Sequence, residues 1–140
     1  MSLRRRLYPG KVVRVLTPRM VEVRIDLGFG VSITRELILD GAPTPESEQW
    51  ELAKRGLIWL TNGMAVYVQC DSMSREPKIT GTLFVKTKNP KADFVEVIEQ
   101  QAYADAAGFM RYAAMTKFAD ITALVREIRS AGENVGRALS

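Results

Sequence analysis

Three stretches of the first forty positions predict β-strands. Residues 11–16 are rich in β-branched side chains, and residues 20–25 alternate between apolar and charged. The third strand is expected over 31–34 and 37–39. Turn signals separate them, namely Thr17-Pro18 and the glycine-rich segment 26–30. The pattern therefore predicts a meander of three short strands.

A proline-rich segment at 43–47 ends the meander and opens a helix expected over Glu48–Leu60, with Ser47 or Thr44 as its cap. Asn62-Gly63 stops this helix. Two further strands are expected after it, over Met64–Cys70 and Thr80–Val85.

From Asp93 onward the spacing predicts helices. A first apolar face consists of Phe94, Val95, Val97, Ile98 and Ala102, and a second of Phe118, Ile121, Leu124, Val125 and Ile128. Five strands, one inserted helix and two appended helices predict an α+β fold, a five-stranded OB-type β-barrel with three helices. We expect one domain over 1–140, with 1–8 as a basic N-terminal arm and 115–140 as a C-terminal helix and tail.

Length and composition fit one globular domain. The chain has 140 residues, of which 46% are hydrophobic and 26% charged, enough for one buried core. No apolar run is long enough to cross a bilayer, and no apolar segment follows the basic N-terminus, so neither a membrane partner nor a signal peptide is expected. The single Cys70 excludes an internal disulfide, which fits a cytoplasmic location.

The sequence contains no histidine. The commonest general base and the commonest zinc ligand are therefore both missing. Hydrolytic chemistry would have to use carboxylates, arginines or a hard cation such as calcium.

The net charge of +4 is unevenly distributed, because residues 1–24 sum to +6 and residues 71–91 to +3. These two segments can follow a phosphate backbone, which makes DNA or RNA a candidate partner. The alternative is an ordinary solvated surface. The candidate binding cations are Arg4, Arg5, Arg6, Lys11, Arg19, Lys86, Lys88 and Lys91.

Phe29 stands between two glycines at the expected hairpin tip. At such a tip a large apolar side chain gains little from burial in its own domain. It can stack on a base, fit a pocket on a protein partner, or fold back over the end of the barrel.

Two segments have a recognisable wording, the DLGFG hairpin at 26–30 and the GAPTPE segment at 41–46. They resemble the staphylococcal nuclease family, in particular its phage-encoded thermonuclease relatives. The order of elements agrees over roughly residues 8–130. The resemblance implies an OB-type barrel and, in active members, calcium-assisted phosphodiester hydrolysis with carboxylates on the ion and arginines on the phosphate.

The catalytic positions that this resemblance implies are mostly lost. The family's first metal-binding aspartate falls on Arg19, its first arginine on Ile38 and its second aspartate on Pro43, and only the glutamate is retained, as Glu46. The family's second arginine has no counterpart at 78–82.

Two neighbouring residues raise the question of a rebuilt site. Arg35 and Asp40 each lie three residues from a lost position. In a regular strand this odd offset points their side chains to the opposite face. Glu46 has a structural explanation as an acid near a helix N-terminus.

We therefore expect no catalysis, no metal site and no cofactor. Three hypotheses stay open. In the first, the chain is a pseudoenzyme that binds nucleic acid, and Arg19 adds positive charge to the cleft where the family has its active site. Alternatively it is a structural or protein-interaction component of a bacteriophage particle or phage–host complex, with a protein partner or a homo-oligomer, located in the host cytoplasm or the virion. The third hypothesis is a residual calcium-dependent nuclease.

Overall fold

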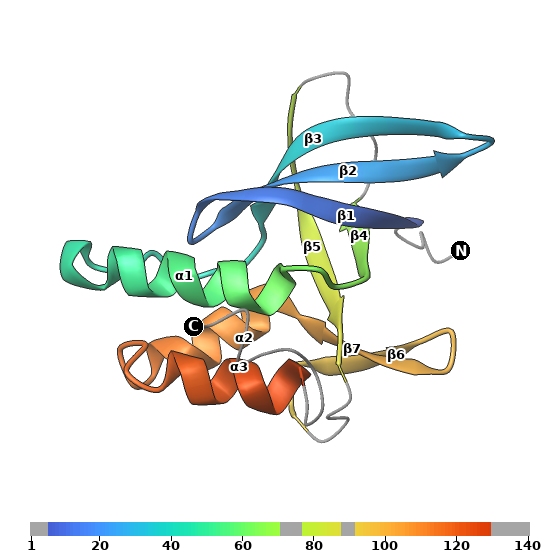
Figure 1. The fold of residues 1–140 in the computed structure, drawn as a ribbon. Helices are drawn as coiled ribbons and strands as arrows, with labels where there is room; N and C mark the ends of the chain where they lie inside the picture. Colours follow the sequence, from blue (N-terminus) through green and yellow to red (C-terminus); the bar gives the residue numbers. More distant parts are fainter. Residues whose placement is uncertain (1–5, 71–76, 88–91, 130–140) are drawn as a thin grey trace.

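The computed structural model describes residues 6–70, 77–87 and 92–129. Over these residues the chain forms a seven-stranded sheet whose first five strands close into a barrel, with three α-helices on one side of it (Figure 1).

The barrel consists of β1 (Arg6–Thr17), β2 (Met20–Gly28), β3 (Val31–Leu39), β4 (Val66–Cys70) and β5 (Lys78–Lys86). The first three strands form the predicted antiparallel meander. β1 also pairs with β4, and β4 pairs with β5. A parallel pairing of β3 with β5 closes the ring. The predicted α+β class and OB-type barrel are thereby confirmed.

β1 is a long strand that pairs with two other strands, β4 and β2. Its first half pairs with β4 and its second half with β2, and Gly10 belongs to both ladders, opposite Ile25 and Val66. A Cβ at Gly10 would lie 2.8 Å from the Arg24 carbonyl oxygen, so glycine permits this close crossing. Register shifts at Val12/Arg14 and Val15/Thr17 bend the strand further round the barrel.

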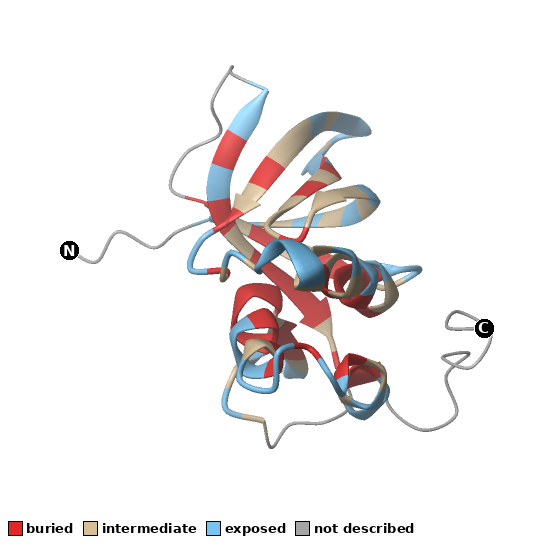
Figure 2. Cartoon of the chain, turned by 90° about the vertical axis from the view of Figure 1, so that its left-hand side faces the viewer, coloured by how far each residue is buried: buried red, intermediate tan, exposed pale blue. Residues whose placement is uncertain are grey.

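The core follows from the period of two along the strands. Alternate residues of β2 and β3, including Val21, Val23, Leu37 and Leu39, are fully buried, and buried positions alternate with more exposed ones along the strands (Figure 2). The residues between them point outward, which determines what the outer face of the sheet carries.

The inserted helix, α1 (Trp50–Thr61), lies close to its predicted range and follows a short 3-10 helix, η1 (Ser47–Gln49). The predicted side-chain caps are wrong, because neither η1 nor α1 has a side-chain capping hydrogen bond. α1 lies between the barrel and the two later helices, α2 (Ala106–Ala114) and α3 (Ile121–Arg129) (Figure 1).

The helix predicted from Asp93 is wrong over its first part. Residues Val95–Ile98 and Gln101–Asp105 form a hairpin, β6 and β7, and β7 pairs with the end of β5. Glu99 and Gln100 make the turn with φ values of 49° and 66°. These residue types rarely adopt that conformation, so the turn had no sequence signal.

The predicted N-terminal arm, 1–8, is too long, because Arg6 already belongs to β1 and pairs with Cys70. Within the described residues no helix combines the length and the apolar character that a membrane crossing requires.

Candidate nucleic-acid interface

The structure brings Arg19 close to Thr44 and to the end of β3, where Ile38 lies. Arg19 lies in the turn between β1 and β2, and its carbonyl oxygen accepts a hydrogen bond from the Leu39 N–H at 2.8 Å. Ile38 pairs with Met20 on one side and with Thr80 on the other. The turn and the ends of β2, β3 and β5 therefore meet at one end of the barrel.

The Arg19 side chain holds the segment that follows β3. Its Nη1 donates to Thr44 Oγ1 at 3.2 Å, and its Nε is buried without an acceptor in the described part of the chain. Part of the Arg19 guanidinium is thus engaged in a hydrogen bond between the β1–β2 turn and the segment that follows β3. Glu46 is exposed just before η1 and makes no capping bond with its side chain.

Sequence reasoning missed a second arginine at this end, Arg111 of α2. Its Nη1 donates to the Gly41 carbonyl oxygen at 2.9 Å, and its Nη2 lies 3.9 Å from Asp105 Oδ2. Gly41 has φ +81°, and Arg111 occupies the space where a Cβ would stand. No local motif marks Arg111, because it reaches Gly41 across seventy residues of sequence.

Asp105 caps α2 by accepting a hydrogen bond from the Ala107 N–H at 3.0 Å. Burial raises the pKa of Asp105, and the charge of Asp40 raises it further. The N–H groups of Gly108 and Ala107 and the Arg111 guanidinium offset part of this rise in the pKa. Arg111 therefore lies among carboxylates at this end of the barrel, namely Asp105 and Asp40. Among the described residues, no three or more potential metal-binding side chains form a cluster.

The pairing register of β2 with β3 shows whether the Arg35 side chain can take the place of the Ile38 side chain. β2 and β3 pair without a shift from Met20 to Asp26, so strand alternation places Arg35 on the face of buried Leu37 and Ile38 on the other. Arg35 does not take the place of Ile38. The same argument does not extend to Asp40, because Pro43 lies outside β3.

A second surface lies on the outer face of the meander. Lys11 of β1 and Arg24 of β2 are directly opposite in the register, and both are exposed. They border a shallow groove of about 430 Å³ that runs to the β2–β3 turn. The groove is lined by Pro9, Gly10, Lys11, Arg24, Asp26, Gly30, Val31 and Ser32.

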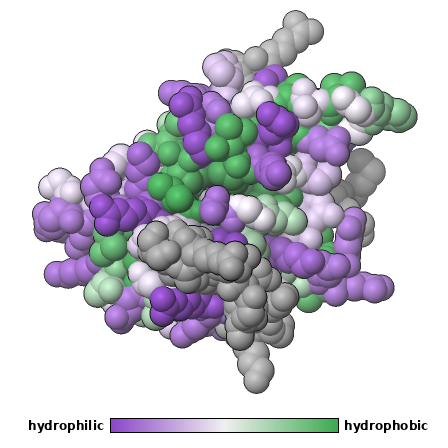
Figure 3. Space-filling model, viewed as in Figure 1, coloured by the Kyte–Doolittle hydropathy of each residue, from purple (hydrophilic) through white to green (hydrophobic). Residues whose placement is uncertain are grey.

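Phe29 at the tip of the β2–β3 hairpin is fully exposed, with φ 55°. The Gly28 N–H donates to Asp26 Oδ1 at 2.8 Å and fixes the start of the turn. Hydrophobic side chains gather at this tip (Figure 3), where Leu27 and Val31 are exposed as well. Of the three alternatives for Phe29, folding back over the end of the barrel is contradicted by the full exposure of its side chain.

The other candidate cations are scattered. Arg6 begins β1 and pairs with Cys70 of β4, whereas Lys86 ends β5 and pairs with Tyr103 of β7. β7 lies in the lower part of Figure 1, away from the β2–β3 hairpin tip. Arg19 and Phe29 stand at opposite ends of β2, about 30 Å apart for nine residues of strand. Arg4, Arg5, Lys88 and Lys91 lie outside the described residues.

Sequence reasoning also missed Arg24 as a site residue. Its signal was present, because the buried alternation of Val21, Val23 and Ile25 forces Arg24 outward. Its pairing with Lys11 depends on the register between β1 and β2, which a bulge shifts.

The structure is an α+β OB-type barrel, and its meander carries a groove that contains Lys11 and Arg24 and reaches Gly30, the residue after the exposed Phe29. Comparison of the chain with protein-family models, with curated proteins and with solved structures finds no match.

Proposed function

We propose that this chain is a binding module, a nuclease-like OB barrel without nuclease chemistry. It holds single-stranded nucleic acid across the outer face of β1–β3. Lys11 and Arg24 bind phosphate, and Phe29 stacks on a base.

The observation that carries this proposal is the Lys11–Arg24 pair. Like charges directly opposite each other destabilise a sheet, and neither residue has an ion-pair partner in the described part of the chain. Arg14, three residues after Lys11 in β1, is by contrast paired with Glu22 at 3.3 Å. A phosphate between Lys11 and Arg24 would replace their repulsion with two attractions.

Phe29 supports the same reading. It occupies a left-handed backbone conformation and gains no burial in return. A base stacked on an aromatic ring contributes on the order of 1–3 kcal/mol in complexes of single strands. Only an unpaired base offers its face to such a ring, which favours a single strand over a duplex.

The non-catalytic part of the proposal rests on the other end of the barrel. Arg19 is engaged with Thr44. Ile38 is apolar at the position where the resemblance implies an arginine. Of the metal-binding positions that the resemblance implies, only Glu46 is a carboxylate, whereas calcium takes six or more oxygens. No group of three or more potential metal-ligating side chains occurs among the described residues.

Fluorescence anisotropy with labelled single-stranded DNA and RNA tests the proposal. Affinity should fall with added salt, and Lys11→Gln and Arg24→Gln should each lower the slope of log K against log salt by about 0.7. Phe29→Leu should weaken binding by roughly tenfold without changing that slope. Arg55→Gln, at an exposed arginine of α1, is the matched control and should behave as wild type.

Binding that ignores salt, or that Arg55→Gln weakens as much as Arg24→Gln does, would contradict the proposal. Cleavage of a nucleic acid that depends on calcium and is lost in Glu46→Ala would restore the nuclease hypothesis.

The exposed apolar tip favours a second candidate function. Leu27, Phe29 and Val31 can together enter a pocket on a protein partner, for example in a phage particle or phage–host complex. In that case oligonucleotides fail to bind, and a partner or a defined oligomer is lost when Phe29 is replaced by serine.

A further inference from the structure

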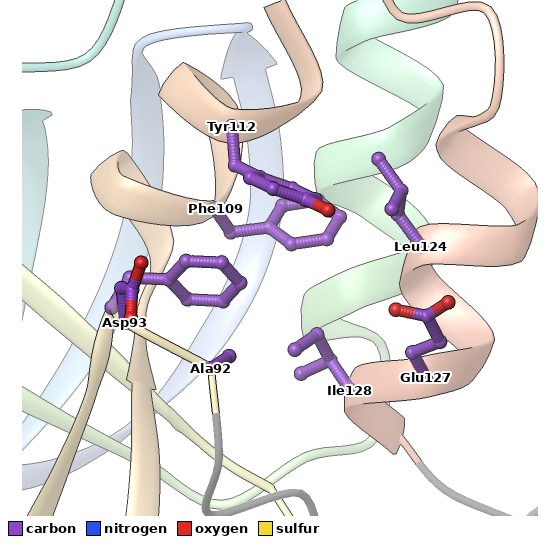
Figure 4. Close-up of a pocket in the computed structure, with 8 residues that line it drawn as sticks. Ala92, Asp93, Phe109, Tyr112, Leu124, Glu127 and Ile128 are labelled. Carbon is purple, nitrogen blue, oxygen red and sulfur yellow. The ribbon is translucent and has the colours of Figure 1, made fainter. Parts of the chain in front are cut away.

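A cavity of about 270 Å³ lies between α2, α3 and the segment 92–94 that precedes β6 (Figure 4). It is on the helical side of the molecule, whereas the β2–β3 hairpin projects from the opposite side of the barrel (Figure 1). Its residues play no part in the proposed nucleic-acid interface, so the two sites are independent.

Aromatic rings form much of its wall. The ring centroids of Phe94 and Tyr112 are 5.8 Å apart with 46° between the planes, and those of Phe94 and Phe109 are 6.0 Å apart at 79°. Phe109 is fully buried and forms the floor, whereas Tyr112 is about half exposed and borders the opening. Because Phe109 is fully buried, the rings that a ligand in the cavity can reach are those of Phe94 and Tyr112.

Two carboxylates accompany the rings. Asp93 and Glu127 line the cavity and are exposed, and the Glu127 carboxylate extends from α3 beside Leu124 and Ile128 (Figure 4). Neither carboxylate forms an ion pair or hydrogen bond with any residue that the structure describes. The cavity therefore combines aromatic rings with two carboxylates that have no ion-pair partner among the described residues.

This combination selects among ligand classes. An anion would be repelled, and a neutral apolar molecule would leave the carboxylates unused. Asp93 and Glu127 belong to no group of three or more potential metal-ligating side chains among the described residues, so a metal ion is not favoured. An alkylated ammonium ion fits both features, because its positive charge is attracted to ring faces within about 6 Å and its methyl groups tolerate an apolar wall.

We propose that this cavity binds the alkylated ammonium group of an organic cation. The same chemistry occurs in a free choline-like molecule and in a trimethylated lysine side chain. The experiment separates these two sources.

The test is an NMR titration of the full chain with choline, with its neutral carbon analogue 3,3-dimethylbutan-1-ol, and with a short peptide that contains trimethyllysine. Choline at millimolar concentration should shift the resonances of residues 92–94, Tyr112 and Glu127, and the neutral analogue should bind roughly tenfold more weakly. Tighter binding of the peptide than of choline would identify a protein-borne cation, and the reverse a small molecule.

Two variants at exposed positions keep the test independent of folding. Tyr112→Leu removes a π face, and Glu127→Gln removes a charge. Each should weaken choline binding by about two- to fivefold at an unchanged melting temperature. Glu96→Gln on β6 is the matched control and should bind as wild type.

Lys91 precedes the cavity by one residue in sequence and carries a cation of its own, so Lys91→Gln is titrated beside the wild type. The proposal is overturned if neither protein binds choline, if choline and its neutral analogue bind equally, or if Tyr112→Leu and Glu127→Gln leave the affinity unchanged.

Discussion

Five non-glycine residues of the described chain adopt left-handed backbone conformations, and they differ in what they gain from it. They are Phe29, Glu99, Gln100, Lys117 and Phe118. Phe118 is almost fully buried, and Glu99 accepts a hydrogen bond from the Tyr67 hydroxyl at 2.9 Å. Phe29 gains neither packing nor a side-chain partner, although a bulky residue in this conformation costs on the order of 1–2 kcal/mol.

We predict that Phe29→Asn separates stability from binding. Asparagine tolerates the left-handed conformation, so the free energy of unfolding should stay equal or rise by up to about 1 kcal/mol. The affinity for single-stranded oligonucleotide should fall at the same time. Urea denaturation and anisotropy on the same samples measure both quantities, and a clear loss of stability would show that Phe29 has packing contacts that matter.

Asp105 provides a prediction about pH. Its pKa is raised in the folded state above the ordinary value of 3.8, mainly by burial. A carboxyl whose folded pKa is raised stabilises the fold below its ordinary pKa, and this contribution is lost as the pH rises through the folded pKa.

Asp105→Asn should therefore be more stable than wild type at pH 7, because asparagine still caps the helix but carries no charge. The difference should disappear as the pH falls below about 3.8. Thermal melts across this range measure it. A variant that is less stable at pH 7 would mean that the ion pair with Arg111 outweighs the cost of burial.

At the level of secondary-structure elements, the contact between α1 and α3 depends on Gly56. A Cβ at this position would lie 2.3 Å from Ile121 Cγ1. Arg129 of α3 adds a hydrogen bond from its Nη1 to the Trp59 carbonyl oxygen at 2.8 Å. The helices therefore pack closely where α1 lacks a side chain.

Gly56→Ala should destabilise the protein by about 1–3 kcal/mol, the cost of overpacking a tight contact. The sign is informative, because the same change in an exposed helix interior stabilises by up to about 1 kcal/mol. Chemical denaturation measures it. Gly56→Ala should cost less in an Ile121→Ala background than in the wild type if the clash with Ile121 is its cause, because that background lacks Cγ1 and Cδ1.

The elements also show which parts of the fold were predictable. The meander and α1 follow from local alternation and turn signals that the structure matches closely. The β6–β7 hairpin was not predictable in this way. The spacing of its apolar residues fits a helix as well as a strand; these residues are Phe94, Val95, Val97 and Ile98. Its Glu99-Gln100 turn lacks the glycine or asparagine that would have decided between them.

The candidate sites were harder to predict from the sequence, because they depend on contacts between residues far apart in the chain. Exposure of Phe29 was foreseeable from its two flanking glycines, whereas the pairing of Lys11 with Arg24 required the strand register. Arg111 and the cavity beside Tyr112 depend on how α2 packs, which no local pattern specifies.

At the scale of the whole molecule, the two proposed sites share no element. The basic groove belongs to β1, β2 and β3, and the aromatic cavity to α2, α3 and the segment before β6. Coupling between sites requires an element whose state both ligands change, and its effect is reciprocal.

We therefore expect that saturating choline leaves the affinity for single-stranded oligonucleotide unchanged within about twofold. Anisotropy titrations with and without choline measure this, with sodium chloride of equal ionic strength as the control. A larger change would reveal communication through the barrel between the helices and the meander.

The parallel pairing of β3 with β5 has a consequence for the order of events during synthesis. Its partners, from Glu36–Lys78 to Leu39–Gly81, lie roughly forty residues apart, so the ring cannot close until β5 has left the ribosome. The meander needs only contacts between neighbouring strands and can form earlier on the emerging chain. The surface that we assign to nucleic acid thus belongs to the part of the protein that is translated first, and a nascent chain would carry it before the barrel is complete.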